Sequence, residues 1–387
     1  MLDPTDAGMA FKLSGLRAGV RDLRIDFFRG LALYMVVVDH IGGDPLGKFT
    51  YQAIGFSDAA EIFIFISGVA CGIAYSSLLE RRGWGALMRV VGVRAIRIYF
   101  YYALSSAAMI LLITAAADIW GNEFRIDDFS GVMKYTDPAL AMWSALSLIS
   151  PSDLSDILVF YIAMTLVAVP ILMAGFRYNA TATLVASAFV WALSQSFSGS
   201  LLCLEGYWTR AINPFAWQFL FAIGMFFGTK RKSPLPDLQS SIVAMAWAIV
   251  VVAFLYKFVI RVSPHLGFDV EWMSISQPTL IEMKVDLSAL RLIHFLSVAL
   301  LVARYFGPTS TLLRWPVFVP VIQIGARSLE IYSLTVVLSV LARIIVTVYH
   351  PSLPSKILMD SVIFVLMALA PAILPRPKMP PSLTTLK

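Results

Sequence analysis

The sequence predicts an all-α integral membrane protein, a polytopic bundle of about ten transmembrane helices with both termini in the cytoplasm. Three observations support this fold class: the composition, the length of the apolar segments and the position of the basic residues. Of the 387 residues, 59% are hydrophobic and only 14% are charged, and the mean hydropathy is +0.78. A soluble domain of this size needs a more highly charged surface. The composition therefore excludes a water-soluble protein.

The apolar segments match the thickness of a bilayer, which takes about 17–25 helical residues to cross. The first segment is short because its ends are polar, and the ninth is long enough to be tilted or kinked. The ten predicted spans are 26–43, 57–78, 95–117, 154–175, 180–197, 213–229, 239–260, 289–306, 317–347 and 357–374.

Basic residues gather on one side of the predicted bundle, which by the positive-inside rule is cytoplasmic. They occur in residues 1–23, 79–97, 230–232, 304–314 and 376–378. The opposite side carries the acidic 118–153 connection and the 261–288 connection. An even number of spans agrees with two cytoplasmic termini. The net charge of +6 is explained by these helix ends, so nucleic acid is not an expected partner.

Residues 24–375 form a single predicted membrane domain between two cytoplasmic tails, 1–23 and 376–387. The first tail has no apolar core followed by a cleavage site, so it is not a signal peptide. Residues 137–149 are either an amphipathic helix along the outer surface or an ordinary helix of an extracytoplasmic loop. The two cysteines, Cys71 and Cys203, imply no disulfide framework.

The first span carries ionisable side chains at both ends. Asp26, Arg29 and His40 recur at steps that place them on one helical face, and Asp39 is 100° away from His40. An ionisable residue within a membrane-length segment is costly and usually faces a protein interior or a water-filled cavity. These residues therefore indicate a site inside the membrane domain.

Five further motifs carry polar residues within or beside apolar segments. They are GFSDAAEIFIFISG with Asp58, Glu61 and Ser67; the Arg94-x-x-Arg97 pair; NPFAWQ with Asn213, Trp217 and Gln218; LRLIHF with Arg291 and His294; and SLEIY with Glu330.

Together these motifs resemble a known family. Arg-x-Asp-x-x-Arg followed by His fourteen residues after the Asp resembles the first-helix signature of the acyltransferase family 3 membrane proteins. FIFISG resembles their second-helix pattern, and Arg94-x-x-Arg97 resembles their third-helix basic motif, although the usual proline is absent. The six segments RDLRIDFFRG, DH, GFSDAAE, NPFAWQ, LRLIHF and SLEIY resemble, in order, one branch: the OpgC family of osmoregulated periplasmic glucan succinyltransferases.

The resemblance implies a multi-pass O-acyltransferase of the inner membrane. Such an enzyme transfers a succinyl group from cytoplasmic succinyl-CoA, the acyl-CoA donor, to sugar hydroxyls of a periplasmic glucan, the acceptor. No metal is expected, and the lipid bilayer is the remaining partner. Succinyl rather than acetyl, direct transfer rather than an acyl-enzyme, and homo-oligomerisation are all left open.

Under this scheme His40 is the general base, since histidine suits proton transfer near neutral pH. Helical rise places it about 24 Å from Arg24, most of the way across the hydrocarbon core. Asp39, Asp58 or Glu61 would orient the imidazole. Either Arg29 or Arg291 would bind the free succinyl carboxylate. The expected donor- and substrate-binding residues are Arg24, Asp26, Arg29, Ser67, Arg94, Arg97, Asn213, Trp217, Gln218, Arg291, His294 and Glu330.

Several of these residues also have a structural interpretation. Arg24 and Arg29 could be snorkelling anchors, and Asp58 with Glu61 fits a helix capping box. Ser67 with Gly68 could form a close helix contact, and Trp217 could belong to an aromatic belt. Glu330 lies within an apolar span, so a partner such as an arginine is expected.

Three other functions compete with this interpretation. The first is an O-acetyltransferase for another envelope polysaccharide. The second is a proton-coupled transporter, because intramembrane Arg, Asp, His and Glu also mark proton and substrate pathways. The third is an assembly protein of a cell-envelope complex, which predicts no acyl-CoA binding.

Overall fold

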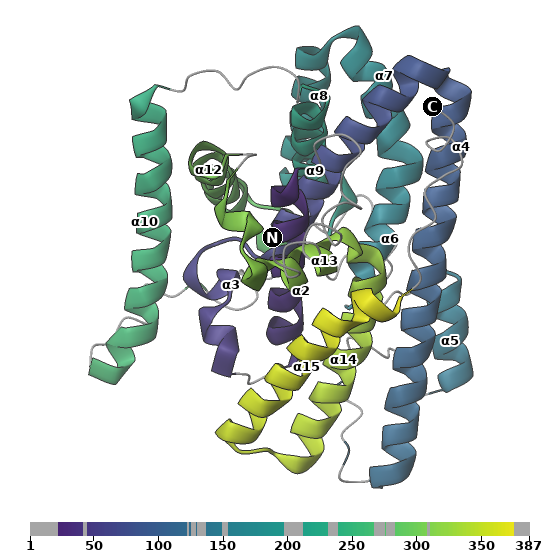
Figure 1. Ribbon diagram of the computed structural model, residues 1–387, viewed down its shortest axis with the longest axis vertical. Coiled ribbons are helices and arrows are strands. Elements are labelled where there is room, and N and C mark those ends of the chain that lie inside the picture. Colours follow the sequence, from purple (N-terminus) through teal and green to yellow (C-terminus); the bar gives the residue numbers. More distant parts are fainter. Residues whose placement is uncertain are drawn as a thin grey trace, which may run out of the picture.

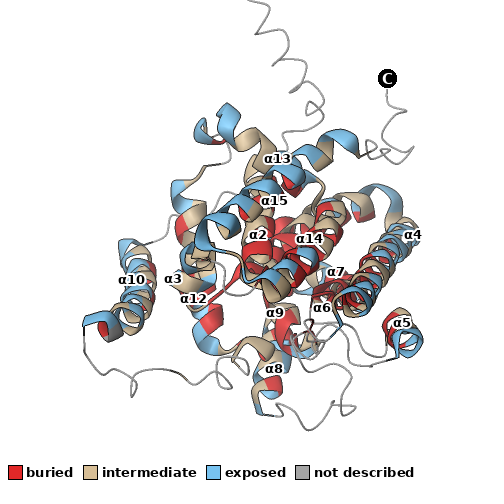
Figure 2. Cartoon of the chain, turned by 90° about the horizontal axis from the view of Figure 1, so that it is seen from below, coloured by how far each residue is buried: buried red, intermediate tan, exposed pale blue. Residues whose placement is uncertain are grey.

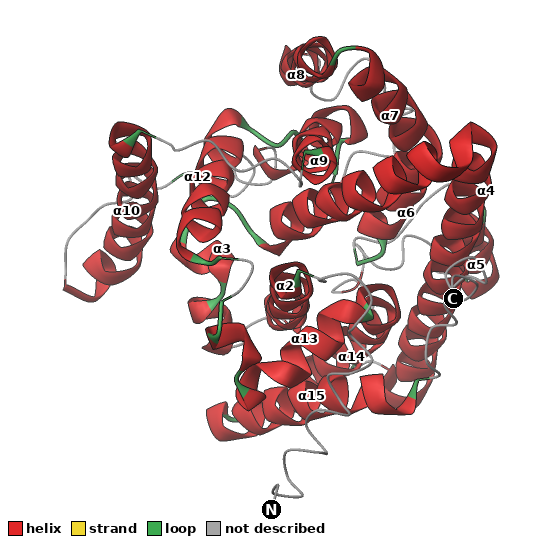
Figure 3. Cartoon of the chain, turned by 45° about the horizontal axis from the view of Figure 1, so that its top comes forward, coloured by secondary structure: helices red, strands yellow, loops and turns green. Residues whose placement is uncertain are grey.

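The computed structural model describes residues 22–41, 45–121, 124, 129, 137–148, 154–196, 212–230, 239–266, 275, 283–307 and 310–374. Within these residues the secondary structure is helical throughout (Figure 3), which confirms the all-α prediction. The tails 1–21 and 375–387 and Cys203 lie outside the described residues.

Helices account for every predicted apolar segment over its described part. The longer ones are α2 (Leu23–Ile41), α4 (Ala59–Trp120), α6 (Asp156–Ala163), α7 (Val169–Tyr178), α8 (Ala180–Ser196), α9 (Pro214–Thr229), α10 (Ser240–Val262), α12 (Ala289–Tyr305), α13 (Val319–Ala326), α14 (Ser328–Tyr349) and α15 (Leu353–Ile373). Shorter elements are η1 (Pro45–Phe49), α3 (Tyr51–Ile54), α5 (Pro138–Leu146), the π-helical turn η4 (Met164–Ala168), η5 (Ser263–Leu266), η7 (Leu312–Arg314) and η8 (Pro316–Phe318).

Five helical stretches in the described chain are long and apolar enough to cross a membrane: α4, the Asp156–Tyr178 stretch, α10, α14 and α15. α10 lies at the edge of the bundle in Figure 1, beside α12 and α3, and exposes large apolar side chains such as Val252, Leu255 and Phe258. Such a surface suits lipid better than water. The count of ten spans and the cytoplasmic side of both termini stay predictions.

The predicted 79–97 connection is helical, because α4 continues through it. One residue interrupts the helical backbone: Gly83, with φ +72°. Glycine adopts this angle without a Cβ clash, so the chain can turn there and resume the helix at once. Figure 1 shows the two halves of α4 meeting at the upper right corner.

The segment 317–347, predicted to be tilted or kinked, is kinked. α13 ends at Ala326, and α14 begins after Arg327, whose backbone is non-helical with φ −120° and ψ 36°. The helix predicted in 137–149 is also present as α5. Asp137 begins it by accepting a hydrogen bond from the Ala139 amide at 2.9 Å.

α2 lies at the centre of the bundle, where Figure 2 shows buried residues gathered along α2 and α14. Its residues Ala32, Leu33 and Val37 are fully buried. Gly30 of α2 and Gly325 of α13 face each other so closely that a Cβ on either would collide with a backbone carbonyl of the other helix. This backbone contact fixes the helix that carries Arg29 and His40.

A seam of four glycines joins the first half of α4 to α9. Gly68 and Gly72 of α4 face α9, and Gly224 and Gly228 of α9 face α4. A Cβ at any of the four would collide with a carbonyl oxygen of the opposite helix. Each helix thus carries a G-x-x-x-G pattern, which allows close backbone approach between helices in a membrane. The alternative interpretation of Gly68 as a close helix contact is confirmed.

We expect Gly224→Leu to destabilise the protein by at least about 1–3 kcal/mol, since backbone atoms rather than a flexible side chain block the new atoms. The measurement is the thermal unfolding midpoint of the detergent-purified protein. Gly92→Leu is the control, because nothing lies within 4 Å of the Cβ position of Gly92. Equal midpoints for the two variants would contradict the seam.

Candidate active site

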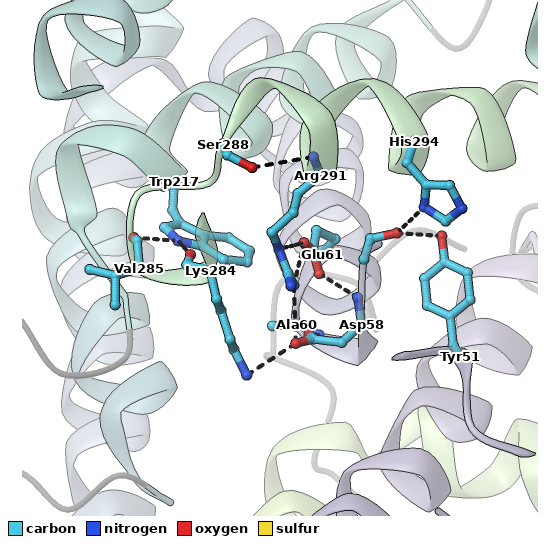
Figure 4. Close-up of polar contacts among 11 residues, drawn as sticks. Tyr51, Asp58, Ala60, Glu61, Trp217, Lys284, Val285, Ser288, Arg291 and His294 are labelled. Atoms are coloured by element: carbon cyan, nitrogen blue, oxygen red, sulfur yellow. Dashed lines mark hydrogen bonds and ion pairs between the residues drawn. The ribbon is translucent and has the colours of Figure 1, made fainter. Parts of the chain in front are cut away.

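The ends of three helices converge on the candidate site. α2 brings His40 in its last turn, α4 begins with Asp58 and Glu61, and α12 brings Arg291 and His294 in its first two turns. Figure 4 shows the α4 and α12 residues pointing toward one another.

Asp58 and Glu61 form the capping box that starts α4. The Asp58 carboxylate accepts from the Ala60 amide at 2.7 Å, and the Glu61 carboxylate accepts from the Asp58 amide at 2.8 Å. Each side chain uses one oxygen for the cap and turns the other toward α12. The structural interpretation of this pair is therefore confirmed, and the remaining oxygens form a second set of contacts.

Those remaining oxygens hold Arg291. The guanidinium donates a hydrogen bond to Glu61 through Nε at 2.7 Å, and one terminal nitrogen forms ion pairs with Glu61 at 2.6 Å and with Asp58 at 3.0 Å. Glu61 is 0% exposed, Asp58 5% and Arg291 9%. Buried ions of this kind are tolerated only when they are paired and hydrogen-bonded. The charge of Arg291 is thus already matched by two carboxylates.

Lys284 is a site residue that the sequence interpretation missed. Its Nζ lies 3.0 Å from the Asp58 carboxylate, and its side chain is 36% exposed. The available signal was a lysine directly ahead of the LRLIHF motif, in a connection on the side of the protein where basic residues are few. Asp58, Glu61, Lys284 and Arg291 are called the charge cluster below.

Side chains of α8 and α9 hold the backbone of residues 284–287. Trp217, fully buried, donates its indole N–H to the first two carbonyls at 3.1 and 3.0 Å. Gln195 donates to the third at 2.6 Å and Trp191 to the fourth at 2.9 Å. Asn213 begins α9 and also donates to the Asp286 carboxylate at 2.8 Å. Asn213 and Trp217 therefore position the segment that carries Lys284.

Gln218, the third candidate of the NPFAWQ motif, joins α9 to α8. It accepts from the Ser187 hydroxyl at 2.6 Å and donates to the Ser187 carbonyl at 2.8 Å. Gln218 thus contributes to the packing of α9 on α8.

His294 lies beside the charge cluster in a second polar group. The Ser57 hydroxyl is 2.7 Å from His294 Nδ1 and donates to the Tyr51 hydroxyl at 2.7 Å. Burial raises the pKa of Tyr51, so its hydroxyl stays neutral. Gly55 packs directly on the imidazole, where a Cβ would collide with the ring. His294 is 2% exposed and is fixed in orientation.

His40 is held in one tautomer. Its Nδ1 lies 2.6 Å from the Val36 carbonyl, an oxygen that can only accept, so neutral His40 carries its proton on Nδ1 and its lone pair on Nε2. Lys284, Asp58 and Arg343 act electrostatically on the ring. The side chain is half-buried, and Asp39 precedes it in the last turn of α2. His40 thus presents a basic nitrogen within the field of the charge cluster.

The expected arginines divide into two groups. Arg24 forms a bidentate pair with Asp22, at 2.9 and 2.7 Å, and donates to the Phe306 carbonyl at 2.8 Å. Arg97 pairs with Glu330, which is the arginine partner expected for that carboxylate. These two arginines contact carboxylates of the chain itself.

Arg29 and Arg94 instead lie within electrostatic range of each other. Asp26 and Tyr161 also act electrostatically on Arg29. Cys71, Tyr75 and Tyr161 act in the same way on Arg94. Ser67 donates weakly to the Tyr161 hydroxyl at 3.3 Å, and Asp26 is buried at 2% exposure. Two cations within electrostatic range of each other repel, and an anion bound near both would relieve this repulsion.

Comparison with known proteins identifies the family. The family model of the OpgC protein matches residues 21–378, nearly the whole chain. The chain belongs to the OpgC family. No curated protein and no solved structure matches the chain.

Membership of the OpgC family implies a membrane acyltransferase, the class that acts on glucans in this family. The family match covers all three helix ends of the site and both groups of arginines. Among the described residues, no three His, Cys, Asp or Glu side chains gather as metal ligands would. The site of this OpgC member offers a base, a paired charge cluster and two arginines within electrostatic range of each other.

We expect Arg291→Met to lower the free energy of unfolding by about 3–5 kcal/mol, because two buried carboxylates lose a partner. The double variant Glu61→Gln/Arg291→Met should recover part of this loss. Thermal unfolding in detergent measures both. Arg304→Met is the control, since Arg304 is an exposed arginine at the far end of the same helix. A midpoint for Arg291→Met equal to that of Arg304→Met would mean that the pairing contributes nothing.

Proposed function

We propose that this OpgC family member is an inner-membrane O-succinyltransferase. It takes the succinyl group from cytoplasmic succinyl-CoA and transfers it to sugar hydroxyls of osmoregulated periplasmic glucans. The observation that carries the proposal is the state of His40: its Nδ1 is bound to the Val36 carbonyl, and Nε2 is left as the basic atom.

In the proposed reaction His40 acts as general base. Nε2 removes the proton of a sugar hydroxyl as its oxygen attacks the thioester carbonyl. The new ester C–O bond forms, the C–S bond breaks, and the thiolate of CoA takes up the proton held by His40. The fixed tautomer supports this role, since a base must be oriented before the reaction begins.

One member of the charge cluster, Asp58, supports the same step through its negative charge. A proton on Nε2 turns His40 into a cation, which Asp58 attracts, whereas Lys284 and Arg343 act on the ring in the opposite sense. A nearby negative charge stabilises the imidazolium that forms during transfer. Asp58 is in this proposal a positioning residue, because it also caps α4 and holds Arg291 and Lys284.

Arg29 and Arg94, which lie within electrostatic range of each other, are proposed to bind the anionic end of the donor. Guanidinium groups match phosphate geometry through bidentate hydrogen bonds. The pairing of Arg24 with Asp22 and of Arg97 with Glu330 makes those two arginines less available for this task. The acyl arm would then extend along α2 toward His40.

We expect His40→Ala to lower glucan succinylation by about 10²–10⁴-fold, the usual contribution of a general base. The gene is deleted in its host and restored as wild type, as His40→Ala or as His350→Ala. Extracted periplasmic glucans are then analysed by mass spectrometry. His350 is an exposed histidine at the end of α14, so its variant should behave as wild type.

Each pattern of mass increments has its own consequence. Succinyl increments that depend on His40 support the reaction and its base. Increments of another mass would keep the transferase and change the donor. Unmodified glucans in every strain would contradict the glucan as acceptor.

We expect Arg94→Ala to raise the KM for succinyl-CoA by about tenfold or more, because a charge-assisted hydrogen bond to the donor is lost. Initial rates in membranes at varied donor concentration measure this effect. Arg89→Ala is the matched control, since Arg89 lies on the same half of α4 and is exposed. An unchanged KM in Arg94→Ala would remove this arginine from the donor site.

A further inference from the structure

Lys284 is the half-exposed member of a charge cluster whose other three members are buried. Its side chain is 36% exposed, against 10% for Arg291, 7% for Asp58 and 0% for Glu61. Arg291 directs its nitrogens at the two carboxylates of α4. Among the described residues Lys284 makes one ion pair, to Asp58, at 3.0 Å. An ammonium group has three donors, so Lys284 can bind a second acceptor from the accessible side.

The charges around this point favour one further anion. Lys257 of α10 lies within electrostatic range of Arg291. Lys257, Lys284, Arg291 and Arg261, which also acts on Lys257, supply four cations, and Asp58 and Glu61 supply two carboxylates. Positive charge is therefore in excess among these six groups. An anionic ligand would reduce this excess.

Side chains of α8 and α9 hold the backbone that carries Lys284. Trp217, Gln195 and Trp191 donate hydrogen bonds to all four carbonyls of residues 284–287. Leu287 at the end of the segment has φ +45°, a left-handed conformation that is costly for a branched side chain. Strained backbone persists only where the surrounding contacts enforce it, and it is concentrated at functional sites.

Lys284 also acts electrostatically on His40. An acyl group whose carbonyl reacts beside His40 would thus carry its far end within the range of this lysine. A succinyl group has a carboxylate at that far end, a few bonds from the reacting carbonyl. An acyl group of equal length without a carboxylate would leave the excess charge unmatched.

We propose that Lys284 binds the free carboxylate of a dicarboxylic acyl group and makes the enzyme select such donors over neutral ones. This inference rests on the proposed acyl transfer at His40. It replaces Arg29 and Arg291 as the expected carboxylate ligand with a residue in the connection before α12. Lys284 acts by binding alone, and no bond to it is made or broken.

The test compares two donors of equal carbon number, succinyl-CoA and its neutral counterpart butyryl-CoA. The full chain in native membranes is assayed with extracted glucan, and kcat/KM is measured for each donor. Lys284→Met should lower kcat/KM for succinyl-CoA by about 10–100-fold, the usual range for a hydrogen bond to a charged group. The value for butyryl-CoA should fall by much less, so that the ratio of the two values changes in favour of butyryl-CoA. Lys284→Arg should keep most of the preference for succinyl-CoA.

Two further variants complete the design. Lys284→Gln removes the charge but can still donate to Asp58, so it should shift the donor ratio in the same direction even where Lys284→Met folds poorly. Lys48→Met is the matched control, because Lys48 is an exposed lysine in η1, outside the charge cluster.

An equal loss with both donors in Lys284→Gln would overturn the inference and assign Lys284 a role in the reaction step or in folding. An unchanged donor ratio in both uncharged variants would overturn it as well. A wild-type protein that is inactive with both donors would count against the proposed function itself. The failure of the proposed function can thus be told apart from the failure of the inference about Lys284.

Discussion

The site depends on one buried interaction, the contact of a single guanidinium with two carboxylates. Asp58 and Glu61 begin α4 and at the same time hold Arg291, so the start of one helix is tied to the start of another. Because all three groups are nearly excluded from solvent, none can lose its partner without a large cost. The positions of His294 and Lys284, on either side of Arg291, follow from this tie. The polar site is thereby part of what holds the helices together.

Away from the charge cluster, close backbone contacts also join the helices. The glycine seam between α4 and α9 and the contact of Gly30 with α13 bring main chains together without intervening side chains. Because lipid provides no hydrophobic driving force for helix association, van der Waals packing of this kind stabilises the contacts between helices. α9 has two roles in consequence: one face packs on α4, and its Trp217 holds the segment that carries Lys284.

The helices could be predicted because they depend on local sequence patterns. The site was harder to predict because it depends on contacts between residues that are far apart in the sequence. Apolar length located the spans, the D-x-x-E pattern identified the start of α4, and an isolated carboxylate implied the arginine partner of Glu330. The importance of Lys284 could not be seen, because the contacts that hold it join Trp217 and Trp191 to residues far along the chain. Likewise the four arginines look alike in sequence. Only their neighbours in space separate Arg24 and Arg97, each paired with an acid, from Arg29 and Arg94.

The position of Arg29 and His40 on one uninterrupted helix has a consequence for donor choice. His40 lies eleven positions after Arg29 in the same helix, so helical rise sets their spacing along the axis at about 16 Å. If the donor's anionic end binds at Arg29, the spacing of Arg29 and His40 along α2 sets the length that the donor needs between that end and its reacting carbonyl. Compact activated acyl groups, such as acyl phosphates, would be too short to reach both points. The length of one helix would then discriminate between classes of donor before any side chain contacts the acyl group.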